Sequence, residues 1–535
     1  MLLFDLCALA GGAKRAQLRS CVHSLHPALP KATLAHRHAR MEMRWRPMPG
    51  AVHPQPQAHW VRANRLDSLP NLVHHRIAPP PPRVDRMRCN THALYARVWL
   101  ALAVLVLPAR ARAGTDAPPP LFIPQFLGAQ TTWIGQQLAP LYARYSGPLS
   151  LPAQGDEALT RTYGVYLGMR LPQHLALYLD TELFRGRGLN DGTGLAGYVN
   201  GDAVRAGPGG RQIPYIARAY LDWNLPLSGA GTATAAAQDQ LPGAVANARI
   251  ELKLGRFAVG DDFDKNRYAN DTRQQFLNWD FINAAAYDYA ADTRGYSNGF
   301  VAALVQPRWT LRYGIFQMPQ RANGQALAAI GQADGQQVQL SLHPQGGDGP
   351  VLRLLVYRNK AAMGSYVQAL AIAAATGAVP NIVADDRIGR HKYGYMINAE
   401  LPLADAGATG LFTRWAWDNG RTETFAYTEA DRALSLGGQF SGAHWGRPRD
   451  RLSVALGIDG LSAPHRDYLA AGGCGFMLCD GALDYGSERV VEAYYRAQFG
   501  RYLQVSPDLQ RIANPGYNRT RGPARVIGVR LHVAI

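Results

Sequence analysis

The sequence predicts an all-β protein: a transmembrane β-barrel of sixteen antiparallel strands with long extracellular loops, one of which folds inward as a constriction loop. Three observations support this fold class. Stretches that alternate between apolar and polar residues recur sixteen times between residues 127 and 535. Their polar faces carry charges of both signs, which need water, and their connections alternate between short and long. Strands with lipid on one side and water on the other show this pattern, and an even number of them closes an antiparallel barrel.

The early strands show the two faces most clearly. Over residues 162–171 and 175–183, apolar side chains follow one face, while Asp180 and Glu182 belong to the other. Residues 217–225 and 249–254 continue the pattern, with charges of both signs on their polar faces. Because a transmembrane strand needs only ~9 to 11 residues, these segments are long enough to cross the membrane beside a water-filled lumen.

The later strands repeat this alternation up to the end of the chain. They include residues 309–315, 352–356, 393–401, 411–417, 452–458, 491–499 and 503–509. The last strand runs from Arg525 to Ile535, with Val529 and Leu531 on the lipid face, and we expect it to close the barrel near Thr132. Aromatic side chains favour membrane interfaces; those expected there are Tyr163, Trp223, Tyr296, Trp309, Tyr393, Trp417 and Phe499.

The lengths of the connections predict the orientation of the barrel. Short connections follow the second, sixth and fourteenth strands, and long ones are centred near residues 190, 275, 375 and 470. Bacterial barrels place short turns in the periplasm and long loops outside the cell. We therefore expect the long connections to be extracellular.

The first part of the chain differs in composition from the rest. Residues 1–113 hold 17 of the 56 Lys and Arg residues and 4 of the 39 Asp and Glu residues, so most of the net charge of +17 lies there. Clustered cations favour nucleic acid, but the remainder of the chain has almost balanced charge and gives that function no support. Within this part, Arg97 precedes the apolar run 98–107, and Ala111-Arg112-Ala113 is typical of a signal-peptidase site.

These features predict a signal peptide over residues 87–113, a periplasmic N-terminal segment at 114–126 and an outer-membrane barrel at 127–535. The apolar run is shorter than the ~20 residues of a membrane-spanning helix. A signal peptide is read at the N-terminus, so Met87 is the better start of the chain. Residues 1–86 are interpreted as a misassigned start or as a disordered basic extension. The predicted location is the bacterial outer membrane, reached through the periplasm.

Cys474 and Cys479 are the two cysteines beyond the signal peptide, and we expect them to form a disulfide in an exported chain. Metal binding by this pair is less favoured because no histidine lies beside it and zinc prefers four ligands. The carboxylates at 261–264 suit calcium but lack the glycine turn and the final glutamate of an EF-hand. We predict neither a metal site nor a cofactor.

Longer segments of the predicted barrel provide independent evidence. They are QTTW at 130–133, YSGPLSL at 145–151, GRFAVGDDFDKNRY at 255–268, FLNW at 276–279, YDYAADTRGY at 287–296, PHRDY at 464–468, EAYYR at 492–496 and NPGYN at 514–518. These segments resemble the carbohydrate-selective porins of the OprB family over nearly all of residues 127–535. The resemblance implies a sixteen-stranded barrel that passes monosaccharides by diffusion. Ile535 departs from the family, whose barrels usually end on an aromatic residue that the assembly machinery reads.

A channel for neutral sugars needs many weak polar partners, because one tight site would block passage. The inward residues of the third to fifth strands flank two long loops, and they are our first candidates for pore-lining residues: Glu182, Arg185, Arg218, Asp222, Arg249, Glu251 and Lys253. The loop at 258–293 is rich in Asp, Asn, Arg and aromatic residues and is the expected constriction loop, with Asp262, Arg273 and Trp279 as candidates. The alternatives are that these side chains hydrate the wall, pair across strands or fasten the loop.

The predicted function is passive diffusion of carbohydrates, such as glucose, through a polar, water-filled channel. The alternative is a nonspecific or anion-preferring general porin, and a barrel enzyme is less favoured. The sequence contains no His-Glu-x-x-His pair, and we predict no catalytic residues. The expected partners are a carbohydrate and outer-membrane lipid, without nucleic acid, in either a monomer or a homotrimer.

Overall fold

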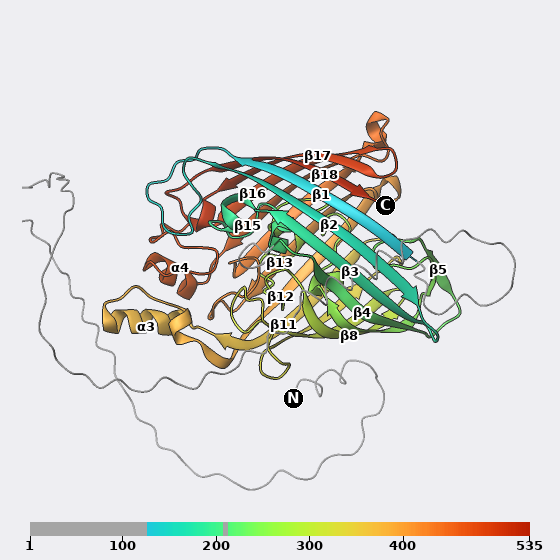
Figure 1. Ribbon diagram of the computed structural model, residues 1–535, viewed down its shortest axis with the longest axis horizontal. Coiled ribbons are helices and arrows are strands. Elements are labelled where there is room, and N and C mark those ends of the chain that lie inside the picture. Colours follow the sequence, from blue (N-terminus) through green and yellow to red (C-terminus); the bar gives the residue numbers. More distant parts are fainter. Residues whose placement is uncertain (1–125, 207–211) are drawn as a thin grey trace, which may run out of the picture. The chain divides into compact units, whose positions relative to one another are not determined.

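The computed structural model describes residues 126–206 and 212–535, in which sixteen strands form one closed barrel (Figure 1). Strands that follow one another along the chain pair antiparallel around the wall. The one interruption is that β4 pairs with β7, because β5 and β6 form a separate two-stranded sheet. The predicted extension at 1–86, the signal peptide at 87–113 and all but the last residue of the segment 114–126 lie outside the described residues.

The strands of the barrel are β1 (Phe126–Leu138), β2 (Asp156–Arg170), β3 (Leu175–Gly186), β4 (Tyr215–Pro226), β7 (Arg249–Phe257), β8 (Ser297–Gln306), β9 (Trp309–Gln317), β10 (Asp334–Leu342), β11 (Val351–Met363), β12 (Arg387–Ala404), β13 (Thr409–Asp418), β14 (Arg432–Ser441), β15 (Arg451–Gly460), β16 (Glu488–Phe499), β17 (Leu503–Ala513) and β18 (Ala524–Ala534). The separate hairpin consists of β5 (Gly231–Thr234) and β6 (Gly243–Ala246).

The helices all lie in the connections. They are α2 (Trp279–Ile282), α3 (Tyr366–Thr376) and α4 (Ala463–Ala470), with the 3-10 turns η2 (Leu189–Gly192), η3 (Gly201–Ala206), η5 (Val259–Asp261), η6 (Val383–Asp385), η7 (Asp405–Gly407), η8 (Gly442–Trp445) and η9 (Pro515–Tyr517). Within the described part of the chain, none of these helices combines the length and apolar character needed to cross a membrane.

The contact between β1 and β18 closes the barrel and confirms the predicted seam. Residues 130–138 of β1 pair with residues 526–534 of β18. Thr132 lies opposite His532, and the Oγ1 and Nδ1 atoms of their side chains are 2.8 Å apart. The sixteen-stranded antiparallel barrel expected from the alternation is therefore confirmed.

The connections alternate in length as the sequence predicts, except that the connection between β4 and β7, residues 227–248, is also long. Short turns cover residues 171–174, 307–308 and 500–502, whereas long loops cover 187–214, 258–296, 364–386 and 461–487. Figure 1 places α3 and α4 at one end of the barrel and β5 at the other. These four long loops thus gather at a single end, which is the extracellular end in a bacterial barrel.

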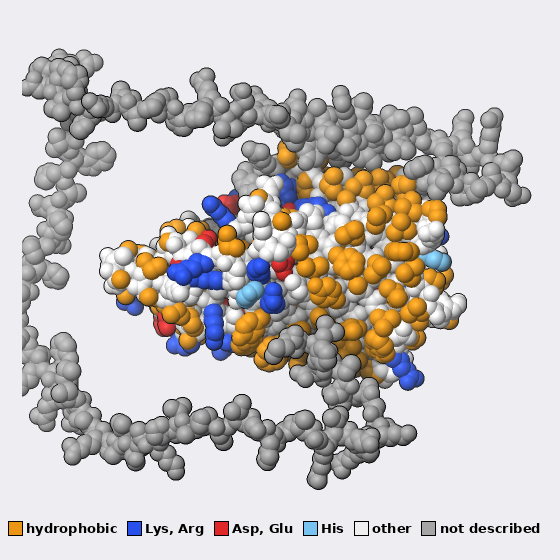
Figure 2. Space-filling view, turned by 90° about the horizontal axis from the view of Figure 1, so that it is seen from below, with side chains coloured by type: hydrophobic (Ala, Val, Ile, Leu, Met, Phe, Trp, Pro, Cys, Tyr) orange, Lys and Arg blue, Asp and Glu red, His pale blue; other side chains and the backbone are white. Residues whose placement is uncertain are grey.

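The outer wall carries the apolar face of the strands, and Figure 2 shows this face as a broad band of hydrophobic side chains. Tyr393, Tyr395, Trp415 and Trp417 contact one another on it. Tyr296, expected at the interface, is instead fully buried. The prediction was wrong for this residue because β8 begins only at residue 297, so Tyr296 still belongs to the loop inside the barrel.

Candidate functional site inside the barrel

The loop at 258–296, named here the constriction loop, leaves β7, enters the lumen and returns to β8. Its aromatic rings pack against the wall: the ring centroid of Phe276 lies 5.0 Å from that of Tyr494, and Phe263 lies 6.4 Å from Phe316. Phe263 and Phe276 are fully buried. The loop therefore has a core of its own, which explains why a connection so rich in aromatic residues does not lie in solvent.

Buried charges of the opposite wall hold this loop in place. Arg414 of β13, 1% exposed, donates a hydrogen bond to Asp264 at 2.9 Å and others to backbone carbonyls of the loop. Glu492 of β16 accepts hydrogen bonds from the backbone N–H groups of residues 277–278 at 2.5 and 2.9 Å. Arg530 of β18 donates to two further loop carbonyls at 2.6 and 2.7 Å. Charge-assisted hydrogen bonds of this kind are the strong ones, so the loop is fixed rather than loosely folded.

Arg218 of β4 joins three separate parts of the chain. Its guanidinium binds the Asp261 carboxylate through Nε and Nη2, both at 2.7 Å. It also lies 3.2 Å from Asp180 on the wall and 3.3 Å from Asp239. Asp261 belongs to the constriction loop and Asp239 to the connection between β5 and β6. One buried cation thus links an extracellular loop with a connection from the opposite end of the barrel.

A second group of ion pairs lies on the neighbouring strand β7. Lys253 donates a hydrogen bond to Asp262 at 3.0 Å, and its ammonium lies 4.2 Å from the ring centroid of Tyr220. Glu251 lies 3.3 Å from Arg249 and 3.1 Å from Arg312. Charges of opposite sign therefore alternate along the lumen wall.

Glu182 of β3 forms a third group. Its carboxylate accepts hydrogen bonds from Arg273 at 2.7 Å, Tyr215 at 2.7 Å and Tyr296 at 2.8 Å. Arg273 also donates to Asp202 at 3.1 Å. These contacts hold Arg273 in place, so Glu182 acts on the lumen by positioning Arg273.

The wall, the constriction loop and the β5–β6 connection enclose a cavity of about 440 Å³. Its charged, amide and aromatic lining residues include Arg218, Tyr220, Asp222, Gln238, Asp239, Gln240, Glu251, Lys253, Asp261, Asp262, Asp271, Arg273, Trp279 and Tyr289. A larger vestibule of about 1230 Å³ adjoins it on the side of β5 and β6. Asp222, Asp239, Gln240 and Glu251 line both spaces, so they mark the passage from one to the other.

Two of the three carboxylates that share Arg218, Asp239 and Asp261, differ in their pKa. Burial acts to raise the pKa of Asp261, but the adjacent Arg218 outweighs it and holds that pKa well below the usual range. Burial raises the pKa of Asp239 above its ordinary value, and Arg218 offsets this effect only in part. Asp261 is therefore the permanent anion of the pair, and Asp239 is the more easily protonated one.

Most of the residues predicted from the sequence meet at this cavity. Seven of them line it: Arg218, Asp222, Glu251, Lys253, Asp262, Arg273 and Trp279. Arg249 lines the vestibule instead, and Glu182 lies behind Arg273.

Arg185 contradicts the prediction, because it is exposed on the outer wall opposite Arg161. Alternation along β3 places it on the same face as Leu183. Its charge suggested a place in the lumen, but its position in the strand determines the face on which it lies.

Two smaller predictions concern cysteines and metal ions. Cys474 and Cys479 are joined by a disulfide in the loop at 461–487. Asp261, Asp262 and Asp264, considered for calcium, each bind a cation of the protein instead. Among the described residues, no group of three or more His, Cys, Asp or Glu side chains has the arrangement of a metal site.

The β5–β6 connection also contributes to the site, although the sequence did not predict it. Gln238 donates a hydrogen bond to Asp180 at 2.7 Å, and the Tyr178 hydroxyl on the wall accepts one from the backbone N–H of Leu241 at 3.3 Å. This segment has neither strand periodicity nor a distinctive motif, so nothing local signals that it enters the lumen.

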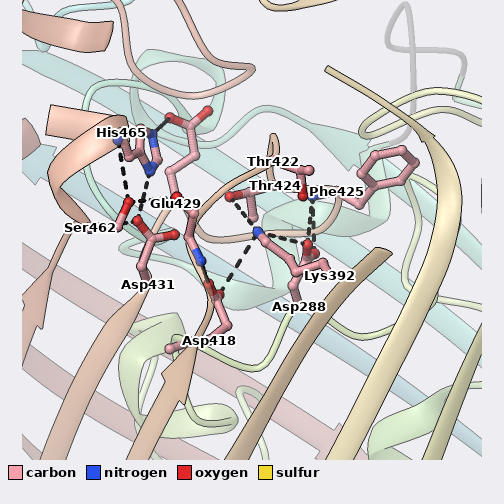
Figure 3. Close-up of polar contacts among 12 residues, drawn as sticks. Asp288, Lys392, Asp418, Thr422, Thr424, Phe425, Glu429, Asp431, Ser462 and His465 are labelled. Atoms are coloured by element: carbon pink, nitrogen blue, oxygen red, sulfur yellow. Dashed lines mark hydrogen bonds and ion pairs between the residues drawn. The ribbon is translucent and has the colours of Figure 1, made fainter. Parts of the chain in front are cut away.

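A further buried polar cluster lies beside the constriction loop (Figure 3). Lys392 of β12 is fully buried, with Nζ 3.2 Å from Asp288 and 3.8 Å from Asp418. Nearby, His465 of α4 lies 3.1 Å from Asp431. Burial alone would lower the pKa of His465, but Asp431 outweighs it and raises this pKa to about 9. Lys392 thus joins the constriction loop to β12 and β13, and His465 joins the loop at 461–487 to the one at 419–431.

Comparison with known proteins identifies relatives of this barrel. The family model described as "Carbohydrate-selective porin, OprB family" matches residues 210–535. The high-pH structure of Pseudomonas putida OprB superposes with a TM-score of 0.55 at 15% identity, covering 77% of this chain and 94% of that one. The outer-membrane channel DcaP of Acinetobacter baumannii gives a TM-score of 0.42 at 10% identity, covering 77% and 96%. Comparison with curated protein sequences returns no significant match.

Proposed function

The chain belongs to the OprB family of carbohydrate-selective porins, and on that premise we propose that monosaccharides such as glucose cross it through the cavity beside Arg218 and Lys253. The protein is a channel of the bacterial outer membrane for the passive diffusion of carbohydrates. The family establishes that function, whereas the path and its residues are our proposal. The observation that carries it is the position of this cavity between the constriction loop and the vestibule.

The chemistry of the lining suits a neutral, hydroxyl-rich solute. Asp222 and Glu251 offer carboxylate acceptors, Arg273 and Lys253 offer donors, and Trp279 offers an aromatic face for the C–H groups of a sugar ring. Each of the four charged side chains also has a hydrogen-bond partner within the protein, so each can exchange one hydrogen bond with a passing sugar without becoming isolated. Several shallow contacts of this kind favour passage over retention.

The pairing of charges argues against the alternative of an anion-preferring general porin. Among the described cations that line the cavity, Arg205, Arg218, Lys253 and Arg273 each lie within 4.0 Å of at least one carboxylate, and the exposed Lys265 is the exception. An anion-selective constriction requires an excess of unpaired cations. Paired charges instead give a strong local field with little net preference for either sign.

We also propose that the channel performs no catalysis and that the exported chain begins at Gly114. The charged side chains around the cavity form ion pairs rather than a nucleophile beside a base. N-terminal sequencing of the protein from outer membranes tests the start. A first residue upstream of Gly114 would contradict it.

Liposome swelling with the purified channel tests the proposed path. Glucose should enter faster than a neutral tripeptide of similar mass, since only the sugar presents hydroxyl groups on a ring. Glu251→Gln should reduce this preference, because Glu251 lines both the cavity and the vestibule. Glu400→Gln is the matched control: Glu400 is also a buried carboxylate paired with an arginine, but it lies outside the cavity. Equal rates for sugar and peptide, or equal effects of the two substitutions, would refute the proposal.

A further inference from the structure

Three arginines mark the outer wall where β16, β17 and β18 reach the extracellular end. Arg489 is the second residue of β16, Arg525 is the second residue of β18, and Arg511 lies two residues before the end of β17. All three are exposed, and each alternates with buried neighbours that face the lumen. Their side chains therefore point outward, toward the outer leaflet of the membrane.

The register of the strands brings these three cations close together. Arg511 lies directly opposite Arg525, and Arg489 lies diagonally from Arg511, because the residue opposite Arg511 is Val491. Directly opposed side chains in a sheet have Cβ atoms roughly 4.5 to 5.5 Å apart, and like charges in that position are destabilising. An anion between them would remove this cost.

The protein itself supplies no such anion among the residues that the structure describes. No ion pair or side-chain hydrogen bond joins Arg489, Arg511 or Arg525 to another residue there. The buried arginines of the lumen differ, since Arg218 and Arg414 both contact carboxylates. The outward group is thus an exposed cluster of positive charge that lacks internal compensation.

The outer wall between this cluster and the membrane centre carries apolar side chains that suit contact with lipid chains. Leu509 and Ile527 are each 58% exposed, and Val529 is 52% exposed, on the same face of β17 and β18. Each cationic side chain is therefore continuous with an apolar strip that runs toward the membrane centre. A ligand that fits both features has an anionic headgroup and acyl chains.

The same arrangement recurs elsewhere on the wall. Arg161 and Arg185 lie directly opposite one another on β2 and β3, and the Arg161 guanidinium lies 5.9 Å from the ring centroid of Trp133. On the face drawn in Figure 2, Lys and Arg side chains also gather on one side of the apolar band. Arg185, which the sequence argument placed in the lumen, thus belongs to the surface that faces the outer leaflet.

We propose that Arg489, Arg511 and Arg525 form a binding site for the phosphate groups of a phosphorylated glycolipid of the outer leaflet. The guanidinium groups bind phosphate through paired N–H donors, for which arginine is better suited than lysine. The acyl chains lie along Leu509, Ile527 and Val529. The site is separate from the lumen, and sugar transport does not depend on it.

The test compares two triple variants that remove the same charge. The first is Arg489→Gln, Arg511→Gln and Arg525→Gln; the control is Arg308→Gln, Arg449→Gln and Arg501→Gln, which removes three exposed arginines from the short turns at the other end. Binding to the folded channel in neutral detergent is measured for diphosphoryl lipid A, its dephosphorylated form and inorganic phosphate. Heat-modifiable gel migration and unchanged ion conductance establish that each variant is folded.

Wild type and control should bind the diphosphoryl form about a hundredfold more tightly than the dephosphorylated form, since each arginine near an anionic surface contributes to binding. The outward variant should lose this difference, and Arg511→Gln alone should lose part of it. Equal binding by the outward variant and the control would overturn the proposal. Equal binding of the two lipid forms, or tight binding of inorganic phosphate without lipid, would overturn it as well. In neutral detergent without lipid, the outward variant should melt at or above the wild-type temperature, because the repulsion between Arg511 and Arg525 is gone.

Discussion

Replacing Arg218 with Gln tests whether one buried cation joins the two sides of the constriction. Arg218 is 9% exposed and contacts Asp180, Asp239 and Asp261. Arg218→Gln leaves these three carboxylates without their shared partner. Removing one member of a buried ion pair costs about 3 to 5 kcal/mol, because the remaining charge stays desolvated. The repulsion between the carboxylates falls if Asp239 and the start of the constriction loop move away from each other.

The size of this cost determines the expected result. About 3 kcal/mol shifts an equilibrium on the order of a hundredfold, enough to convert a closed contact into a mostly open one. The rest of the loop stays in place, because Arg414 and Glu492 hold it independently. We therefore expect a wider cavity within an intact barrel.

Planar-bilayer recording measures this change. Arg218→Gln should increase the single-channel conductance, shift the ion preference toward cations and weaken the inhibition of current by glucose. Arg218→Lys should give an intermediate result, because lysine keeps the charge but loses the two-point contact with Asp261. Arg353→Gln is the control, since Arg353 is a lumen arginine that pairs with Glu400 away from the cavity. Wild-type conductance and glucose inhibition in Arg218→Gln would refute the reasoning.

Three further predictions concern other parts of the barrel. Arg414→Met leaves Asp264 buried without its cation at a cost of about 3 to 5 kcal/mol, so limited proteolysis should cut the constriction loop faster than in wild type; unchanged protection would contradict its anchoring role. Arg185→Gln should leave sugar-driven liposome swelling at the wild-type rate, because Arg185 faces outward; a reduced rate would indicate that Arg185 faces the lumen. Asp431 raises the pKa of His465 to about 9 from its usual 6.5, so this pair contributes stability that is complete below pH 6.5 and is lost as the pH rises to 9. The contribution is at most about 3 kcal/mol. The melting temperature of the wild type should therefore fall more steeply with pH over this range than that of His465→Gln, and an equal decrease in both would contradict the contribution of this pair.

The strands and their faces could be predicted because a β-barrel wall has a local signal. Side chains alternate between lipid and water, so each strand reports its own orientation, as β18 does up to residue 534. Arg185 shows that position in this alternation outweighs side-chain charge near the end of a strand, where an outward cation reaches the headgroups. Alternation alone would have placed it correctly.

The arrangement of the interior could be predicted only in part. The composition of the constriction loop indicated that it folds inward, but its anchors lie far away in the sequence: Arg414 binds Asp264, 150 positions earlier, and Glu492 binds the backbone of Leu277. Contacts between residues so far apart in the chain produce no periodic pattern in the sequence. Asp239 was missed for the same reason, since its role depends on Arg218 being opposite it rather than on its neighbours.

The most direct test of the proposed sugar path is the conductance of single wild-type channels while glucose is added. If glucose binds in the cavity beside Arg218 and Lys253, the conductance should fall with saturable dependence on glucose concentration, and the Glu251→Gln channel should need more glucose for the same decrease. A decrease that follows only the viscosity of the solution, equal to that caused by an inert polymer too large to enter, would contradict the account.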